Sequence, residues 1–427
     1  MEWTGVASDH EFNSQTRLPR NVWAVTITSL LTDISSEMLF NLLPLFLLNV
    51  LGTRTSIIGL IEGLAETTSS LLKIFSGWLS DRWGSRKNLA VSGYVLSTLA
   101  KPFLYFASSW GWVLGVRFMD RIGKGIRTAP RDALIADSVK EGQRGIAFGV
   151  HRAGDTAGAV LGLGIALVIL FATQGHEKIL TRRTFQWIVL ASIIPAILAV
   201  LVLVIFARDS KGTQTKQGRH RSSFRNLDRR FRIFLVIMTL FTLGNSSDAF
   251  LILRAQTAGL SVPGILGMLI TFNVVYALTS GPAGAFSDRV GRKGLLVTGW
   301  ILYGLVYLGF AQSTAGWQAW VLMAAYGLFY GLTEGVAKAF VADLVAPERR
   351  GTAYGFYNAA VGITAFPASL TAGILWQGVG NWAGFGASAP FLFGAILALL
   401  ATVCLIFLPS LRNTDDPMRS VNDYDLT

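Results

Sequence analysis

Apolar runs of about 20 residues recur along nearly the whole sequence, and they constrain the fold more than any other feature. Each run is long enough to cross the ~30 Å hydrocarbon core of a bilayer as a helix. Examples lie at 57–79, 185–206, 233–253 and 391–408. Only 15% of the 427 residues are charged, well below the share typical of soluble domains. The sequence therefore predicts an all-α membrane protein with many spans.

We predict twelve transmembrane helices, near residues 22–50, 56–79, 88–107, 111–137, 145–171, 184–207, 232–254, 263–286, 294–312, 317–343, 351–376 and 388–408. The polar N-terminus lacks the apolar core and cleavage site of a signal peptide, so the first span is expected to act as its own insertion signal. Most of the 37 Lys and Arg residues fall in segments that this topology places in the cytoplasm, and 4 fall in external segments. By the positive-inside rule we expect the chain in the cytoplasmic (inner) membrane, with both termini in the cytoplasm.

The composition excludes several functional classes. The net charge of +12 is mostly a consequence of this topology, so we expect no nucleic-acid partner. Cys404 is the only cysteine, which excludes an intrachain disulfide and a cysteine-based metal site. The four histidines are scattered, and the sequence has no nucleotide-binding loop or nucleophile elbow. We therefore do not expect an enzyme, a cofactor or a metal site.

The sequence consists of two halves that resemble each other, separated by a polar segment with nine basic residues at 208–232. GWLSDRWGSRK (77–87) recurs as GAFSDRVGRK (284–293), and ADSVKEGQRGIAFG (136–149) recurs as ADLVAPERRGTAYG (342–355). A parallel duplication of six helices is typical of transporters whose halves rock around a central solute site. The expected segments are an N-terminal tail (1–21), an N-terminal bundle (22–207), a basic linker (208–231), a C-terminal bundle (232–408) and a C-terminal tail (409–427).

On these repeats the chain resembles the major facilitator superfamily over essentially its whole length. The family's loop signature between helices 2 and 3 has the form G-x-L-a-D-r-x-G-r-k, which here includes Asp81 and Gly84, with Ser85 departing from it. A second copy, with Gly291, lies between helices 8 and 9. The resemblance implies the major facilitator fold, with two pseudo-symmetric six-helix halves and with helices 1, 4, 7 and 10 around a central cavity.

The resemblance also implies a role for these loops. A carboxylate at a helix end can meet backbone N–H groups and nearby guanidinium groups. Such contacts are expected to form a latch that biases the protein between conformations open to either side, although a solvated basic turn is the alternative. The predicted gating residues are Asp81, Arg82, Arg86, Asp137, Asp288, Arg289, Arg292 and Asp343.

The stretch RFMDRIGKGIRTAPRD (117–132) places five cations and two carboxylates in one predicted membrane-spanning helix. On a helix, charges that recur every three or four residues fall within an arc of about 120°. Ionisable groups at membrane depth cost at least about 2.5 kcal/mol each and face protein or water. The stripe is therefore expected to line a cavity or to pack against complementary charge. It consists of Arg117, Asp120, Arg121, Lys124, Arg127 and Arg131.

Complementary charge is available within the N-terminal half. Its expected buried acids are Asp33, Glu37, Glu62, Glu66, Asp120, Asp132 and Asp155. Its expected buried bases are Lys73, Arg117, Arg121, Lys124, Arg127, Arg131 and Arg152. Seven acids against seven bases permit a network that neutralises itself, so the cations alone do not imply an anionic solute.

For each of these residues a structural ion pair competes with a functional role. The structural role is favoured toward the cytoplasmic ends, for Lys73, Arg127, Arg131, Asp132 and Arg152. The functional role is favoured nearer the midplane, for Asp33, Glu37, Arg117, Arg121 and Lys124. For Glu62 and Glu66 both roles stay open.

Part of RFMDRIGKG also resembles a helix 4 signature of the family, R-x-x-q-G-x-g, that is tied to proton coupling. Arg117 takes the arginine position, while Asp120 replaces an amide and Arg121 replaces a glycine. A buried arginine beside a carboxylate can make protonation of that carboxylate depend on conformation or solute. The expected proton-coupling residues are Asp33, Glu37, Asp120 and Arg117.

The spans of the C-terminal half contain fewer charges, and amide and aromatic side chains are more prominent there. An ionic wall on one half and an amide and aromatic wall on the other would suit a polar or amphipathic solute. The predicted substrate-binding residues are Ser36, Glu66, Arg121, Lys124, Asn245, Asp248, Asn273, Tyr330, Glu334 and Asn358.

The leading hypothesis is a proton-coupled secondary active transporter that moves a small polar or amphipathic organic solute by alternating access. The glycines of 154–164 partly resemble the helix 5 signature of exporters but lack its proline, so export is favoured only slightly over uptake. Two alternatives stay open: a facilitator or anion exchanger that binds an anionic solute through the helix 4 arginines, and a non-transporting receptor or lipid-handling protein. The expected partners are the solute, protons and the lipid bilayer, and the protein is expected to be a monomer.

Overall fold

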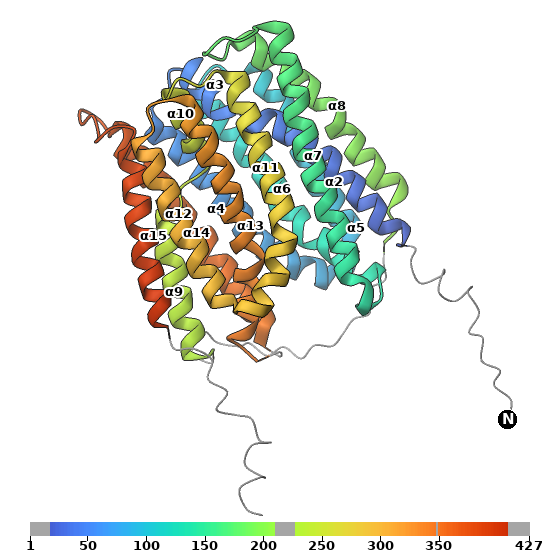
Figure 1. Ribbon diagram of the computed structural model, residues 1–427. Helices are drawn as coiled ribbons and strands as arrows, with labels where there is room; N and C mark the ends of the chain where they lie inside the picture. Colours follow the sequence, from blue (N-terminus) through green and yellow to red (C-terminus); the bar gives the residue numbers. More distant parts are fainter. Residues whose placement is uncertain (1–17, 210–226, 347–348, 409–427) are drawn as a thin grey trace, which may run out of the picture.

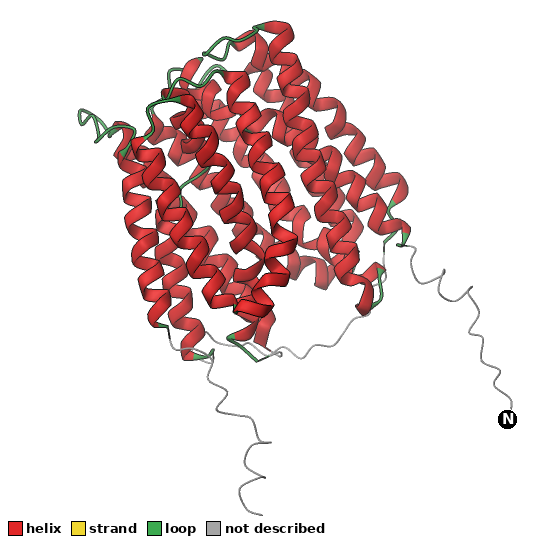
Figure 2. Ribbon diagram, viewed as in Figure 1, coloured by secondary structure: helices red, strands yellow, loops and turns green. Residues whose placement is uncertain are grey.

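A computed structural model describes residues 18–209, 227–346 and 349–408, and the predicted tails and linker lie largely outside these ranges. All regular secondary structure in the described ranges is helical (Figure 2). The N-terminal half contains α2 (Arg20–Phe40), α3 (Leu43–Asn49), α4 (Thr55–Trp83), α5 (Arg86–Ala100), the 3₁₀ helix η1 (Lys101–Phe106), α6 (Trp110–Ser138), the 3₁₀ helix η2 (Glu141–Gln143), α7 (Arg144–Thr173) and α8 (Arg182–Phe206). The C-terminal half contains α9 (Arg229–Gly244), α10 (Ala249–Thr257), α11 (Val262–Val290), α12 (Arg292–Gln312), α13 (Gly316–Asp343), α14 (Arg350–Gln377) and α15 (Ala389–Phe407).

These helices account for the twelve predicted spans. Three spans consist of two consecutive helical segments: α2 with α3, α5 with η1, and α9 with α10. Among the described residues, nine spans are long and apolar enough to cross a membrane by composition alone. The other three are α4, α6 and α13, and α6 contains the predicted charged stripe. The prediction of an all-α fold with two six-helix halves is confirmed.

The first and seventh spans are interrupted, where the sequence predicted continuous helices at 22–50 and 232–254. The first break lies just before Pro44, at the second position of α3, because proline has no N–H to donate within a helix. The second break covers 245–248, where Asn, Ser and Asp side chains compete for backbone hydrogen bonds. Ser247 illustrates this competition, because its Oγ accepts a hydrogen bond of 3.3 Å from the backbone N–H of Ala249.

The two halves lie side by side and meet along two pairs of helices, α4 with α14 and α7 with α11 (Figure 1). The Oγ1 of Thr55 donates to the carbonyl oxygen of Gly373 at 3.1 Å. Further along the same pair, the Oγ1 of Thr67 donates to the carbonyl oxygen of Gly362 at 2.6 Å. Small residues therefore let these two helices approach closely, as is usual in helical membrane proteins.

Both copies of the repeated loop lie at the same end of the bundle, which we call the motif end; the opposite end, with Arg54 and Gln377, is the distal end. Gly84 follows α4 with φ of 67°, and its N–H donates to the carbonyl oxygen of Ser80 at 3.1 Å. Gly291 follows α11 with φ of 93°. This left-handed region favours glycine, which explains the glycine in both copies of the signature.

The halves are joined at the distal end and diverge toward the motif end (Figure 1). At the distal end, the Nη1 of Arg54 donates to the carbonyl oxygen of Gly380 at 2.8 Å, and the N–H of Thr55 donates to the Oε1 of Gln377 at 2.7 Å. Toward the motif end, α4 leaves Trp78 half exposed. The structure is therefore closed at its distal end.

Candidate functional site

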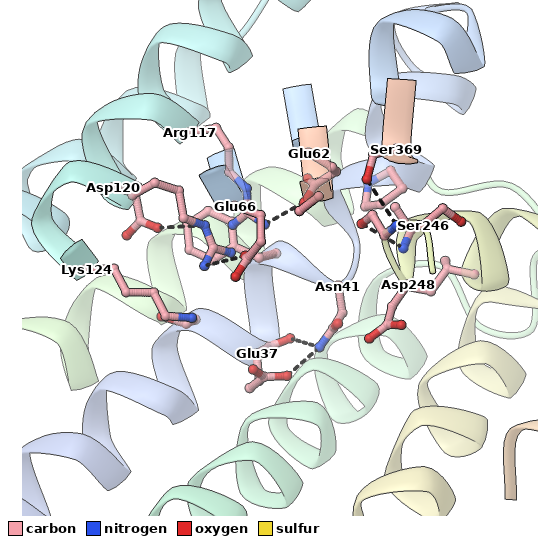
Figure 3. A pocket seen from close by; sticks show the side chains of 18 of the residues that line it. Glu37, Asn41, Glu62, Glu66, Arg117, Asp120, Lys124, Ser246, Asp248 and Ser369 are labelled. Carbon is pink, nitrogen blue, oxygen red and sulfur yellow. Dashed lines mark hydrogen bonds and ion pairs between the residues drawn. The ribbon is translucent and has the colours of Figure 1, made fainter. Parts of the chain in front are cut away.

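A cavity of about 420 Å³ lies between the two halves, about midway along the helices. Its walls come from α2, α4 and α6 of the N-terminal half, and from the α9–α10 break, α13 and α14 of the C-terminal half (Figure 3). Its charged lining residues are Asp33, Glu37, Glu62, Glu66, Asp120, Asp248, Arg117, Arg121, Lys124 and Arg127.

Helical spacing brings these side chains to one place. On α2, Ser36 and Glu37 follow Asp33 by three and four residues and Phe40 follows Glu37 by three, so they share one face of the helix, and all four line the cavity. On α6, the predicted stripe lines the same cavity from 117 to 127. The predicted orientation of the stripe toward a cavity is confirmed for this part of α6.

Two arginines of α6, Arg117 and Arg121, are paired with carboxylates across the cavity wall. The Nη2 of Arg117 lies 2.9 Å from the Oε2 of Glu62, and both side chains are nearly buried. The Nη1 of Arg121 lies 3.9 Å from the Oε2 of Glu66, and its Nε lies 3.9 Å from the Oδ2 of Asp120. Each guanidinium group therefore lies beside a carboxylate, while the Nε and Nη1 of Arg117 and the Nε of Arg121 have no hydrogen-bond partner among the described residues.

Phe40 on α2 lies among three cations and was not predicted as a site residue. Its ring centroid is 4.2 Å from the Cζ of Arg117, 5.8 Å from the Cζ of Arg121 and 5.8 Å from the Nζ of Lys101. The electron-rich face of an aromatic ring attracts cations at these distances. Phe40 therefore helps to hold the guanidinium groups of α6 in place.

Lys101 is a buried base that the predicted charge count left out. It begins η1, is only 1% exposed, and its Nζ donates to the Oγ of Ser35 at 2.6 Å and to the Oγ of Ser36 at 3.1 Å. The prediction of seven bases did not include it. By the same span bounds Asp137 is an eighth acid, at the end of 111–137, so each predicted count was one short and their equality stands at eight against eight.

The cavity wall itself has an excess of carboxylates. Six acidic side chains line it and only four basic ones, and the excess persists when Lys101 behind Ser36 is added. Unbalanced charge is unfavourable at membrane depth. With all of its ionisable groups charged, the cavity wall would carry a net negative charge.

Two of these carboxylates have only uncharged hydrogen-bond partners among the described residues. The Oε2 of Glu37 accepts from the Nδ2 of Asn41 at 2.7 Å, and the Oδ1 of Asp248 accepts from the hydroxyl of Tyr326 at 2.8 Å. Figure 3 places Asp248 and Lys124 on opposite sides of the cavity, with Glu37 between them. The carboxylate of Asp248 thus faces the charged wall of α6 across the space.

The break between α9 and α10 forms the C-terminal wall. The N–H of Ser247 donates to the Oγ of Ser369 on α14 at 3.1 Å. The hydroxyl of Tyr303 lies 3.3 Å from the Oδ1 of Asn245. Interrupting the helix frees polar backbone and side-chain groups at the depth of the cavity, where irregular backbone is tolerated only beside protein or water.

The structure brings most of the predicted residues to this cavity. All four predicted proton-coupling residues line it. Seven of the ten predicted substrate-binding residues also line it: Ser36, Glu66, Arg121, Lys124, Asn245, Asp248 and Tyr330. Their roles stay predictions; the structure shows only that these residues line the same cavity.

Asn273, Glu334 and Asn358 are not among the residues that line the cavity. The Nδ2 of Asn273 donates to the carbonyl oxygen of Leu269, one turn earlier on α11, at 3.0 Å. Glu334 instead forms an ion pair with Arg152. In this conformation the positions of these three residues do not support their predicted contact with a solute in the cavity.

The residues predicted to be structural behave differently from one another. The Nη2 of Arg131 lies 2.8 Å from the Oδ1 of Asp132, as expected for a structural ion pair. Arg127 has no ion pair among the described residues; it lines the cavity, and its Nη1 donates to the Oγ of Ser97 at 2.9 Å. Arg152 pairs with Glu334 of the other half at 2.8 Å.

The predicted latch residues form ion pairs within each half. The Nη1 of Arg86 lies 2.5 Å from the Oδ2 of Asp137, and its Nη2 lies 3.8 Å from the Oδ1 of Asp81. Arg292 and Asp343 form the corresponding ion pair in the other half. These pairs tie α5 to α6 and α12 to α13 at the motif end, and their role in gating stays a prediction.

The remaining predicted latch residues are not part of these pairs in the described structure. The guanidinium of Arg82 lies over the ring of Trp78, 5.5 Å from its centroid. Arg289 is exposed, and the side chain of Asp288 lies outside the described part of the chain. Asp209 is an unpredicted addition, because its carboxylate accepts from the hydroxyl of Ser85 at 2.7 Å and from the first N–H groups of α5.

Sequence reasoning did not predict several polar or aromatic residues here, among them Phe40, Asn41 and Ser369 in the lining and Lys101 behind Ser36. Phe40 and Asn41 continue the face of Asp33 and Glu37 by one helical turn, so periodicity could have found them. Lys101 was visible as a charge inside an apolar span. No sequence signal pointed to Ser369.

The sequence matches the family described as Major Facilitator Superfamily over residues 25–272 and 233–422. An uncharacterised MFS-type transporter of Methanocaldococcus jannaschii is 36% identical over 397 residues, which cover 92% of this chain and 95% of that protein. This relative and the family match together span nearly the whole chain.

Solved structures show the same architecture. A mutant of the nucleoside transporter NupG superposes with a TM-score of 0.75 at 14% identity, covering 91% of this chain and 100% of that one. A D-xylose–proton symporter superposes with a TM-score of 0.72 at 18% identity, covering 92% of this chain and 98% of that one. At these identities the likeness concerns the fold, and it agrees with the family match. The chain belongs to the Major Facilitator Superfamily of membrane transporters.

Proposed function

We propose that this protein is a proton-coupled secondary active transporter for a small polar or amphipathic organic solute. The observation that carries the proposal is the excess of carboxylates in the central cavity, six against four bases. Carboxylates at membrane depth are stable when they are protonated or face a cation. A cavity with such an excess takes up protons when it is empty and releases them when a solute or a change of conformation supplies compensating charge.

Asp33, Glu37 and Asp120 are the proposed proton carriers. Asp33 lines the cavity and, unlike Glu37 and Asp120, forms no hydrogen bond or ion pair among the described residues; Lys124 and Arg127 act on it from a distance. Arg117 does not deprotonate and acts by position, because its guanidinium faces the cavity beside these carboxylates. The Arg117–Glu62 pair keeps that position fixed.

The solute is proposed to bind between the ionic wall of α6 and the wall formed by Asn245, Asp248 and Tyr330. The excess of carboxylates supports a solute with at least one positively charged or hydrogen-donating group. Pairing of Arg117 and Arg121 with carboxylates counts against anion exchange through these arginines. Direct roles of Asn273, Glu334 and Asn358 would require a different conformation.

Alternating access is supported by the two ends of the structure. The halves are sealed at the distal end by contacts such as Arg54 with Gly380, while Lys124 lines the cavity and is exposed to solvent. We propose that the motif end faces the cytoplasm, because basic residues concentrate there. The pairs Arg86–Asp137 and Arg292–Asp343 would then act as the cytoplasmic latch.

The direction of transport is proposed to be export. Protons and a cationic group would compete for the same carboxylates, and mutually exclusive occupancy produces exchange of one for the other. A proton gradient directed into the cell would then drive the solute out. The glycine-rich face of α7 is compatible with this direction but is equally explained by close packing on α2.

The test begins with a thermal-shift screen of the purified protein against organic cations, organic anions and neutral amphipathic compounds. A compound that stabilises the protein is then added to proteoliposomes loaded with a pH-sensitive dye. We expect solute flux to be accompanied by proton flux, and we expect the Asp33→Asn variant to lose the proton flux. Glu177→Gln, an exposed position at the distal end, is the matched control and should leave it unchanged.

Three results would overturn the proposal. Solute flux that ignores a pH gradient would show a facilitator, and selective stabilisation by anions would favour the exchanger. Binding without any accumulation in proteoliposomes would instead indicate a receptor or lipid-handling role.

A further inference from the structure

His151 on α7 is a buried imidazole outside the cavity. Its side chain is 6% exposed, and neither ring nitrogen forms a hydrogen bond within the described structure. Buried polar groups almost always have a partner, and leaving one without any costs about 1–3 kcal/mol. An imidazole kept in such a place therefore calls for a ligand, and a proton is the smallest one that it binds near neutral pH.

Asp155 lies one helical turn along α7 from His151. The Nε2 of His151 is 3.7 Å from the Oδ2 of Asp155, and the Oδ1 of Asp155 is buried without a hydrogen bond in the described chain. At this distance the two side chains attract each other strongly only when the imidazole is protonated. The pair is thus arranged to gain from binding one proton.

The charged groups around the pair leave it without a fixed counter-ion. Those acting on His151 are Arg131 and Asp132 from α6, and Arg152 and Asp155 from α7. Arg131 is bound to Asp132 at 2.8 Å, and Arg152 is bound to Glu334 at 2.8 Å. Both arginines are bound to carboxylates other than Asp155; Arg131 also acts on Asp155 from a distance, and the described structure shows no ion pair between Asp155 and either arginine.

The pair also lies beside the cavity. α7 packs along α2, and a Cβ placed on Gly158 would lie 3.1 Å from the Cβ of Asp33. Gly158 follows Asp155 by one turn on the same face of α7, so this face approaches Asp33, whose carboxylate lines the cavity. The charge of Asp155 also acts on Asp33. Of the pair, Asp155 lies nearer to Asp33 along α7, and His151 lies one turn closer to the motif end, where α7 begins at Arg144.

We infer that His151 and Asp155 form a proton-binding pair that relays protons between Asp33 on the cavity wall and the motif end. The inference rests on the proposed coupling of transport to protons. A proton leaves the carboxyl group of Asp33, binds between the Nε2 of His151 and the Oδ2 of Asp155, and passes to water at the motif end. The pair changes from a net charge of −1 to zero and back, and no other reactant is needed.

The first experiment measures protonation of His151 directly and needs no solute. The full-length chain is placed in lipid with histidines 10, 176 and 220 replaced by Gln, and its one remaining histidine is labelled with ¹⁵N. Solid-state NMR then separates the neutral imidazole from the doubly protonated form between about pH 8 and about pH 5. We expect both forms across this range, and we expect Asp155→Asn to lower their protonated-to-neutral ratio by about tenfold.

The matched control keeps only His176, which is exposed at the distal end and packs beside Phe171. Its ratio should not respond to Asp155→Asn. The conservative variant Asp155→Glu should retain the response of His151, which separates a charge effect from a folding defect. The inference is overturned if His151 stays in one protonation form over the whole pH range. It is also overturned if the protonated-to-neutral ratio of His151 is the same with Asp155 as in the Asp155→Asn variant.

A second readout separates this inference from the proposed function. In proteoliposomes, His151→Gln should slow solute-driven proton flux while leaving solute binding in a thermal-shift assay unchanged. If the NMR response is present but wild-type solute flux carries no protons, the proposed coupling fails and the pair remains a proton-binding site. If coupled flux is normal in His151→Gln, the relay is wrong and the coupling through Asp33 survives.

Discussion

The Nη2 of Arg152 lies 2.8 Å from the Oε2 of Glu334, and this ion pair joins α7 of one half to α13 of the other. Tyr276 also donates to the same carboxylate oxygen of Glu334, and the Nζ of Lys338 lies 3.4 Å from the other. The other ion pairs between described side chains each stay within one half. A rocking motion of the halves must therefore break or rearrange the contact between Arg152 and Glu334.

We expect Arg152→Gln to increase the population in which the halves are separated at the motif end, because the pair bridges the halves on that side of the cavity. Both side chains are partly exposed, so the contribution of the pair is about 0.2–1 kcal/mol, a change of up to about fivefold in the ratio of conformations. The measurement is the distance between spin labels at positions 140 and 290, which lie at the motif end of each half, after Cys404→Ser. The charge-swapped double variant Arg152→Glu with Glu334→Arg should restore the wild-type distance distribution; an unchanged distribution in the single variant would contradict this role.

Glu62→Gln should destabilise the protein strongly. The Arg117–Glu62 pair is nearly buried, and removing one partner leaves an uncompensated guanidinium, which costs about 3–5 kcal/mol. Thermal unfolding in detergent should show a clear fall in Tm, with Glu177→Gln unchanged as the control. In the double variant Glu62→Gln with Arg117→Gln, the Tm should recover in part, and a double variant less stable than Glu62→Gln would argue against the pair.

Lys101→Met should lower the Tm by less than Glu62→Gln does. Lys101 is bound by the hydroxyls of Ser35 and Ser36 and has no carboxylate partner among the described residues. Replacing it with an apolar side chain of similar length removes a buried charge without leaving an opposite charge alone. The two variants are compared in the same unfolding assay, and an equal or larger fall for Lys101→Met would mean that this cation balances a carboxylate after all.

Gly63→Ala should weaken the distal closure. A Cβ on Gly63 would lie 2.9 Å from the carbonyl oxygen of Phe366 and so force α4 and α14 apart. Overpacking of this kind costs about 1–3 kcal/mol, or about fivefold or more in the ratio of conformations. Spin labels at positions 183 and 383 at the distal end should report longer distances. Gly115→Ala, whose Cβ would meet nothing within 4 Å, should leave the distances unchanged.

Local patterns in the sequence predicted much of this protein. Apolar length located the spans, the duplicated motif divided them into halves, and spacing of three and four residues placed 117–127 of α6 on a cavity wall. Each of these features depends on the periodicity of a single helix or on a repeat along the chain. Such features can be read from the order of residues alone, because they do not depend on how helices pack against one another.

The pairing of these residues depends on the packing of helices that are far apart in the sequence. Arg117 with Glu62, Lys101 with Ser35, and Arg152 with Glu334 each join different helices. The rotation and vertical offset of each helix against its neighbours select these partners, and the periodicity of one helix contains no information about either quantity. For the same reason the equal count of acids and bases was misleading. Tertiary packing gathers six carboxylates and four bases around one cavity, and places the His151–Asp155 pair beside it.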